Sequence, residues 1–194
     1  MPTSARARTA VTSTPILNVL AQRWSPRAFD VTREVDETKL TAALEAARWS
    51  PSASNSQPWR FIVARRGTPQ FSAIEGTLMG FNAAWAGSAG ALLVAVTEVI
   101  DSEGKARPWA QYDLGQAMAH FSVQAHADGL HVHQMGGFDA DALRTAFDLP
   151  EQLVPLSVSA VGTLGSPEQL PEPTRAREIA PRERRPLVQS LIGA

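Results

Sequence analysis

The chain has no cysteine, which excludes disulfides, thiolate metal ligands and cysteine nucleophiles. Redox chemistry would therefore depend on a bound cofactor, because no remaining side chain supplies it. Long apolar runs are missing too. The longest, residues 90–96, is far shorter than the about 20 residues that a bilayer-spanning helix needs, so we expect no membrane contact.

An excess of charge of either sign is also absent. The 18 basic and 19 acidic residues give a net charge of −1, which argues against nucleic acid as a partner. The 194 residues fit one domain. We expect residues 1–14 to be a tail, disordered or packed down, and residues 15–194 to be that domain. The tail has no apolar segment typical of a secretory signal, so the expected location is the cytoplasm.

Apolar spacing predicts helices over residues 15–24, 38–49, 69–79, 108–128 and 140–147, with strands over 59–64, 89–97, 130–135 and 154–162. Thr14, Asp36 and Asp139 are placed to cap three of the helices. The helix at 108–128 is apolar around most of its circumference, which is typical of a buried or interface helix. These elements predict an α+β fold in which helices flank a mixed β-sheet. After residue 162 the chain loses all periodicity.

The segment Arg23-Trp24-Ser25-Pro26-Arg27 is the most informative motif. Each guanidinium is a planar, permanently charged fork that matches a pair of phosphate oxygens, and the serine adds a hydroxyl donor. The motif therefore indicates an anion site. A solvated helix end, where cations are favourable on dipole grounds, explains the same residues equally well.

Other motifs are weaker. Asn55 and Gln57, in a proline- and serine-rich loop, most simply form local turn bonds. The pair Gly136-Gly137 allows close backbone approach to a ligand, or is an ordinary loop. The four histidines lack further ligands at a clear spacing, which disfavours a metal site. Neither a dinucleotide fingerprint nor a serine-hydrolase elbow is present.

Taken together, these segments resemble the nitroreductase family of flavin-dependent oxidoreductases. The matching segments, in chain order, are residues 23–29, 50–61, 111–117, 135–139 and 182–187. The resemblance implies an intertwined homodimer, with the 108–128 helix central in its interface and residues 165–194 extending over the partner. It also implies two FMN sites at that interface.

The same resemblance assigns roles to individual residues. Arg23 and Ser25 are expected to hold the phosphate and ribityl end, and Arg27 the pyrimidine edge of the ring. The backbone N–H groups of Gly136 and Gly137 are expected next to flavin N5, so no side chain is assigned as catalytic. The full set expected to bind the cofactor is Arg23, Trp24, Ser25, Arg27, Pro51, Ser52, Ala53, Asn55, Gln57, Asn82, Met135, Gly136, Gly137, Arg182, Arg184 and Arg185. Among these, Pro51, Ser52, Ala53 and Asn55 are expected from the partner subunit.

The implied activity is reduction of a nitroaromatic, quinone or similar acceptor by NADH or NADPH, with hydride passing through flavin N5 in a ping-pong scheme. Three departures leave the acceptor open. Gly136 replaces an acidic residue of many relatives, Trp85 replaces a lysine of some, and the residues at 131, 133 and 135 differ from the common ones: His131, His133 and Met135. The alternatives are a dehalogenating or flavin-fragmenting member, a non-catalytic flavin-binding or storage protein, and a dimeric domain without flavin.

Overall fold

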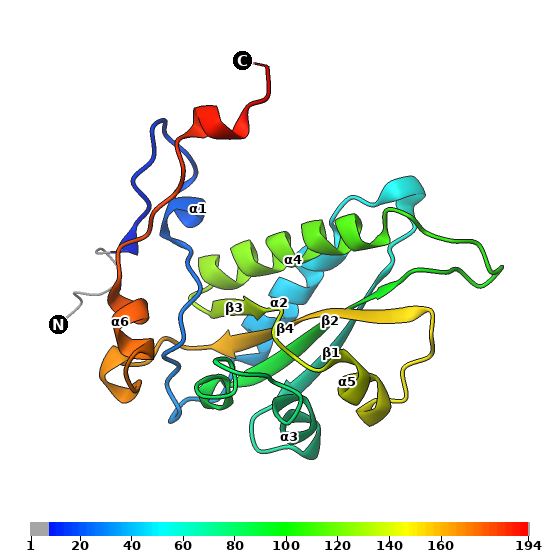
Figure 1. The fold of residues 1–194 in the computed structure, drawn as a ribbon, viewed down its shortest axis with the longest axis horizontal. Helices are drawn as coiled ribbons and strands as arrows, with labels where there is room; N and C mark the ends of the chain where they lie inside the picture. The colour runs from blue at the N-terminus through cyan, green and yellow to red at the C-terminus, as the bar shows by residue number, and fades with distance from the viewer. Residues whose placement is uncertain (1–7, 194) are drawn as a thin grey trace.

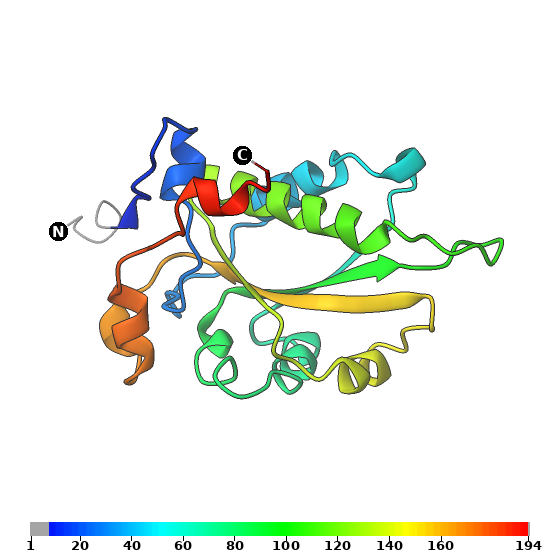
Figure 2. The same cartoon turned by 45° about the horizontal axis from the view of Figure 1, so that its top comes forward.

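One sheet separates two layers of helices in the computed structural model, which describes residues 8–193 (Figures 1 and 2). Its strands lie in the order β1-β2-β4-β3. Their bounds are β1 (Trp59–Arg65), β2 (Ala91–Glu98), β3 (His131–Met135) and β4 (Leu153–Gly162). The α+β prediction is confirmed. Residues 1–7 of the expected tail, with Arg6 among them, lie outside the described residues, as does residue 194.

The pairing of the strands corrects the expectation of a mixed sheet, because all three strand pairs are antiparallel. Helix α4 (Ala110–Ala127) does form a crossover between the parallel strands β2 and β3. Strand β4 lies between these two, however, and runs opposite to both. Alternation of strands and helices along the chain therefore did not reveal which strands become neighbours.

Strand β2 is buried on both faces and divides the core into two clusters. Leu92, Val94 and Val96 face the cluster that includes α3 (Pro69–Glu75) and α5 (Ala140–Ala146). Ala91, Leu93 and Ala95 face the cluster under α2 (Glu37–Arg48) and α4. The period of two is what a strand dictates, since successive side chains point to opposite faces.

Two of the three expected helix caps are confirmed. Asp36 accepts the N–H groups of Thr38 and Lys39, and Asp139 caps α5 in the same way. Thr14 does not cap a helix, because α1 (Asn18–Gln22) begins later, after Leu17. Helix α3 also ends early, at Glu75, where the Thr77 hydroxyl donates to the carbonyl of Ile74 and turns the chain.

Helix α4 buries one face on its own sheet, through residues such as Leu114, Ala117 and Phe121. Its opposite face is exposed at Tyr112 and Gly115. The apolar pattern around the helix thus serves first to cover the sheet of the same chain. Its role in a dimer interface stays a prediction.

The C-terminal segment is more ordered than its sequence indicates. It contains α6 (Thr174–Ile179) between two short 3₁₀ turns, η4 (Pro167–Gln169) and η5 (Leu187–Ser190). Further 3₁₀ turns are η2 (Ala53–Asn55) and η3 (Ala86–Ser88). Figure 1 shows the C-terminal segment running back beside the N-terminal one. In the part of the chain described here, no helix has the length and apolar character to cross a membrane.

Candidate functional site

The segment after α1 is held in an extended conformation by the strand end of β4. Phe29 forms a bridge with Leu164, and the N–H of Gly165 donates to the carbonyl of Ala28 over 2.9 Å. From the other side, Nδ1 of His133 on β3 bonds the carbonyl of Pro26 at 2.9 Å, so this nitrogen carries the proton. The motif at residues 23–27 is therefore a fixed part of the fold.

Three arginines from opposite ends of the chain converge beside this segment. Burial lowers the pKa of Arg23, and the neighbouring Arg184 lowers it further. The pKa of Arg182 is lowered by burial and then by Arg23, Arg184 and Arg8. None of the ion pairs found between residues 8 and 193 involves Arg23, Arg182 or Arg184. This arginine cluster of residues 23, 182 and 184 therefore carries positive charge without an acidic partner, which suits an anion.

The arginines of residues 182–185 differ in what they contact. Arg182 donates from Nη1 to the carbonyls of Arg8 and Ala21, each at 2.8 Å, and so joins the two chain ends. Arg184 and Arg185 are exposed, and within residues 8–193 the Arg184 guanidinium bonds only the carbonyl of its neighbour Glu183, from Nη1. Arg184 thus has the freer guanidinium for a ligand, and Arg182 is partly engaged in the fold.

A hollow of about 350 Å³ opens beside Arg23 and Ser25. It runs along α4 past Ala119 and Val123 to Val132 and Gln134 on β3. Trp24 is buried and does not line this hollow, and the Arg8 guanidinium lies 3.9 Å from the centre of its ring. The hollow joins the arginine cluster to the exposed face of α4.

A second group of expected residues meets at the turn after β3. The side-chain amide of Asn82 donates to the carbonyl of Gly137 over 3.2 Å, and Met135 is buried directly before the glycine pair. A Cβ on Gly137 would approach the Asn82 amide nitrogen to 2.9 Å, whereas one on Gly136 would meet nothing within 4 Å. Arg27 lies nearby, its guanidinium 5.4 Å from the ring of Phe81.

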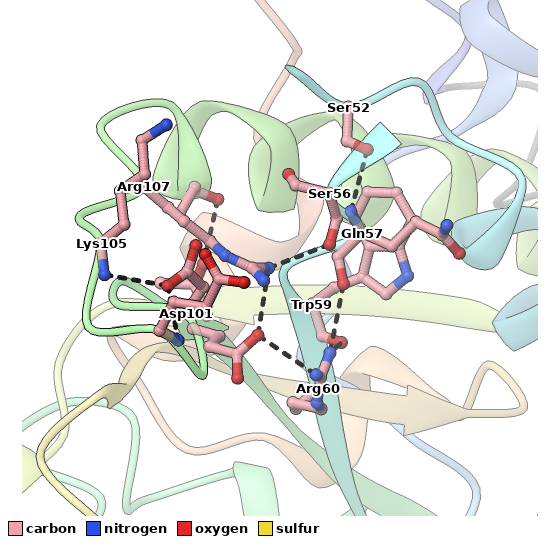
Figure 3. Close-up of polar contacts among 12 residues, drawn as sticks. Ser52, Ser56, Gln57, Trp59, Arg60, Asp101, Lys105 and Arg107 are labelled. Carbon is pink, nitrogen blue, oxygen red and sulfur yellow. Dashed lines mark hydrogen bonds and ion pairs between the residues drawn. The ribbon is translucent and has the colours of Figure 1, made fainter. Parts of the chain in front are cut away.

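The third group is the loop of residues 50–57, at the other end of α4. Figure 3 shows Arg107 donating to the carbonyl of Ser56 at 2.9 Å, and Arg60 donating to the carbonyls of Gln57 and Trp59. The same figure shows the Gln57 N–H bonded to the Ser52 hydroxyl, at 3.0 Å. These bonds hold the loop against β1 and against the turn of residues 99–107, which the bridge between Ile100 and Ala106 closes.

The loop is also pinned to α4 and is held in an unusual conformation. The buried Asp113 accepts the N–H of Ala53 at 3.0 Å, and Ser50 bonds Nδ1 of His120 at 2.7 Å. Ser54, Asn55 and Gln57 all have positive φ, a region that side chains other than glycine seldom adopt. Pro51, Ala53, Asn55 and Gln57 are exposed at its surface.

The expected site residues therefore fall into groups that one chain does not bring together. Asp113, which holds the loop, and His126, next to Arg23 and Arg182, are about 20 Å apart along α4 at 1.5 Å per residue. The loop and the arginine cluster lie at opposite ends of this helix. Within one chain the loop therefore does not reach the cluster. That a partner subunit supplies residues 51–55 to the site stays a prediction.

Several residues that shape these groups were not predicted. Glu178 bonds the backbone at residues 27 and 28, and Asp113 and Arg107 hold the loop. For His133 the sequence disfavours a metal site and predicts no other contact. Its ring instead packs on Trp85 at 4.5 Å, while His126 and His131 approach edge to face at 5.3 Å. Except for the contact between His126 and His131, these contacts join segments far apart in the chain, so no local sequence signal marks them.

Acid should weaken the fold through His133 and His131. Burial lowers the pKa of each to about 4, with Arg27 as a further cause at His133. The folded state thus keeps both rings neutral while the unfolded chain binds protons first, below pH of about 6.5. The contribution of each neutral ring to the free energy of unfolding should be complete above that pH and be lost as the pH falls toward 4, by on the order of 3 kcal/mol for each ring.

Urea unfolding at pH 7.5, 5.5 and 4.5 measures this loss. We expect His133→Asn to show a shallower pH dependence than the parent. Parallel pH profiles for the two proteins would contradict the assignment of the effect to His133.

Comparison with known proteins identifies the family. A protein-family sequence model, described as the nitroreductase family, matches residues 20–74 and 65–163. The chain therefore belongs to the nitroreductase family. A solved structure described as an oxidoreductase containing FMN has a TM-score of 0.88 and 33% identity, covering 100% of this chain and 97% of that one.

Two curated relatives extend the comparison. An uncharacterized 15.4 kDa protein of Mycolicibacterium smegmatis is 35% identical over 138 residues, which is 67% of this chain and 92% of that protein. The oxygen-insensitive NAD(P)H nitroreductase of Salmonella typhimurium is 41% identical over 49 residues, which is 25% of this chain and 23% of that enzyme.

Proposed function

We propose that this protein is an FMN-dependent oxidoreductase that uses NADH or NADPH to reduce an organic acceptor, such as a nitroaromatic or a quinone. Family membership gives the class, and relatives named for FMN and for NAD(P)H give the cofactor and the co-substrate. The observation that carries the proposal for this chain is the arginine cluster, in which Arg23, Arg182 and Arg184 converge and form no ion pair with a carboxylate of residues 8–193.

A phosphate fits this cluster on chemical grounds. Arg23 and Arg184 would each supply a charge-assisted hydrogen bond, and such bonds are about twice as strong as neutral ones. Ser25 lines the adjoining hollow together with Val132 and Gln134. These two residues belong to β3, which leads to the turn at Gly136 and Gly137. A phosphate held at the cluster would therefore direct the rest of the cofactor along α4.

The flavin ring of FMN would fit the residues around Gly136, at the turn after β3. The Nε of Arg27 is buried and has no hydrogen-bond partner among residues 8–193, so it can donate to an acceptor on a ligand. The bare backbone at Gly136 leaves room for close approach. When bound, FMN would supply the redox chemistry by taking hydride from the nicotinamide and passing it to the acceptor. Arg27 then contributes a fixed positive charge, which favours an anionic reduced ring.

A homodimer completes the site in this proposal. The loop of residues 50–57 is exposed and rigidly held, yet it lies far from the arginine cluster of its own chain. The exposed face of α4 and the exposed side chains of Leu17, Leu187, Val188 and Ile192 offer the apolar surface for association. A twofold arrangement would place each loop against the partner's cluster.

The direct test of the function is spectroscopic. Purified protein should bind FMN with flavin absorbance, be bleached by NADH or NADPH without oxygen, and regain its colour with a quinone or nitroaromatic. Binding without reduction by either nicotinamide would favour the storage alternative. A protein that does not bind FMN at all would refute the proposal.

Placing a charge on the exposed face of α4 should separate the subunits. Gly115 is exposed and its Cβ position is open, so Gly115→Arg is compatible with the isolated fold. Buried in a dimer interface, the added charge would lack a partner, which costs several kcal/mol. We expect a dimer for the parent and a monomer with at least about tenfold weaker FMN binding for the variant.

Sedimentation velocity measures the subunit state. The matched control is Ala142→Arg, which adds the same charge at an exposed position of α5 on the opposite face of the sheet (Figure 2). A dimeric Gly115→Arg protein with normal FMN binding would exclude this face as the interface.

A further inference from the structure

Glu178 is a buried carboxylate in a segment that the sequence presents as an aperiodic tail. Its side chain is 0% exposed, although it belongs to the short helix α6 near the end of the chain. An ionised carboxylate is costly to bury unless its oxygens are bonded and its charge is balanced. What Glu178 contacts therefore indicates why it is buried.

Both oxygens of Glu178 bond the motif segment. The N–H of Arg27 lies 3.0 Å from each oxygen, and the N–H of Ala28 lies 3.2 Å from Oε1. The Arg27 guanidinium approaches the same group, with Nη1 3.7 Å from Oε2. The Glu178 carboxylate thus contacts both the backbone N–H and the guanidinium of Arg27.

The segment that carries Glu178 is itself fixed against residues 28–30. Nε2 of Gln169 donates to the carbonyl of Phe29 at 2.7 Å, and Gly165 packs on the same peptide. Arg8 is electrostatically coupled to Glu178 and to Arg27 from the other side, while its guanidinium lies over Trp24. The position of the carboxylate is therefore determined by the fold and does not require a ligand.

We infer that Glu178 is a positioning residue that sets the direction and the effective charge of Arg27, and thereby the reduction potential of the flavin. This inference rests on the proposed function, which places the pyrimidine edge of FMN at Arg27. An arginine paired with a carboxylate offers less positive potential to a ligand than an unpaired arginine does. Glu178 then keeps the flavin harder to reduce than Arg27 alone would.

The sign of the effect follows from charge. Reduction adds negative charge to the ring, so any change that makes its surroundings more positive favours the reduced form. Glu178→Gln removes the negative charge but keeps an oxygen that can accept a backbone N–H. We expect the two-electron midpoint potential to rise, with a change in the redox equilibrium of about tenfold, or about 30 mV for a two-electron couple.

The experiment compares midpoint potentials of the FMN-loaded parent and Glu178→Gln by dye equilibration. The matched control is Glu172→Gln, which removes the same charge from an exposed residue of the same segment that pairs with Arg175. We expect its potential to equal that of the parent. Thermal unfolding of both variants is recorded alongside, because loss of buried contacts alone would lower the melting temperature of Glu178→Gln and leave its potential unchanged.

A double-mutant cycle tests whether the effect passes through Arg27. In the Arg27→Gln background, the rise caused by Glu178→Gln should be clearly smaller. If Glu178→Gln does not fold, Glu178→Asp keeps the charge but withdraws it from Arg27, and a smaller rise is expected.

An unchanged or lower potential in a Glu178 variant that folds and binds FMN overturns the inference while the proposed function stands. An equal rise with and without Arg27 overturns it as well. Failure of the parent protein to bind FMN refutes both.

Discussion

Replacing Arg23 by alanine should weaken FMN binding by about ten- to a hundredfold. The change removes one charge-assisted contact to phosphate, worth about 1.5–3 kcal/mol, and each 1.4 kcal/mol is about tenfold in the dissociation constant. Arg23 is half-buried beside other arginines and has no acidic partner among the described residues. The loss should therefore appear in binding and hardly in the stability of the apoprotein, where removing a repelled charge is mildly favourable.

Titration of the apoprotein with FMN, followed by quenching of flavin fluorescence, gives the dissociation constant. Arg175→Ala is the matched control, since Arg175 is an exposed arginine whose partner is Glu172. The salt dependence adds a second measurement, because a site with one fewer cation should lose less affinity at high ionic strength. Equal affinities of Arg23→Ala and the parent would show that Arg23 does not contact the phosphate.

Replacing Gly165 by alanine should destabilise the fold by about 2–3 kcal/mol. A Cβ at this position would lie 2.6 Å from the carbonyl carbon and 2.8 Å from the oxygen of Phe29. These are backbone atoms of the bridge that holds residues 27–30, so the strain cannot be relieved by turning a side chain. The displaced segment carries Arg27, and FMN binding should weaken along with stability.

Chemical denaturation of the apoprotein measures the destabilisation. Gly136→Ala is the control for stability, because its Cβ would meet nothing within 4 Å and its φ is not left-handed. We expect its free energy of unfolding to stay within about 0.5 kcal/mol of the parent. A Gly165→Ala protein as stable as this control would mean that the peptide of Phe29 yields easily.

Local patterns predicted most elements of this fold, because those elements depend on neighbouring residues. Local apolar patterns, which for β2 are a continuous apolar run, located the four strands and the principal helices of the described chain. The Asp36 and Asp139 caps follow from side chains that bond the next turn. The strand order did not follow from such patterns. It depends on the insertion of β4 between β2 and β3. The paired residues of β2 and β4 are about 60 positions apart in the sequence.

The same distinction applies to the candidate site. Arg23, Ser25 and Arg27 form a compact motif that is visible in the sequence. The glycine pair is visible there too, and the family resemblance added Asn82, which the structure brings to it. Glu178 could not be recognised, because a lone glutamate among prolines and arginines looks like a solvated tail. Its role depends on contacts with residues 150 positions away. The assignments of individual residues to FMN stay predictions that the experiments above test.

The loop at residues 50–57 has a consequence for engineering. Ser54, Asn55 and Gln57 each occupy a left-handed conformation that costs on the order of 1 kcal/mol or more. Glycine at any of the three would relieve that cost and widen the range of shapes that the loop can adopt. Selection for heat resistance alone would therefore favour such changes, at the expense of the fixed loop shape on which the proposed site between subunits depends.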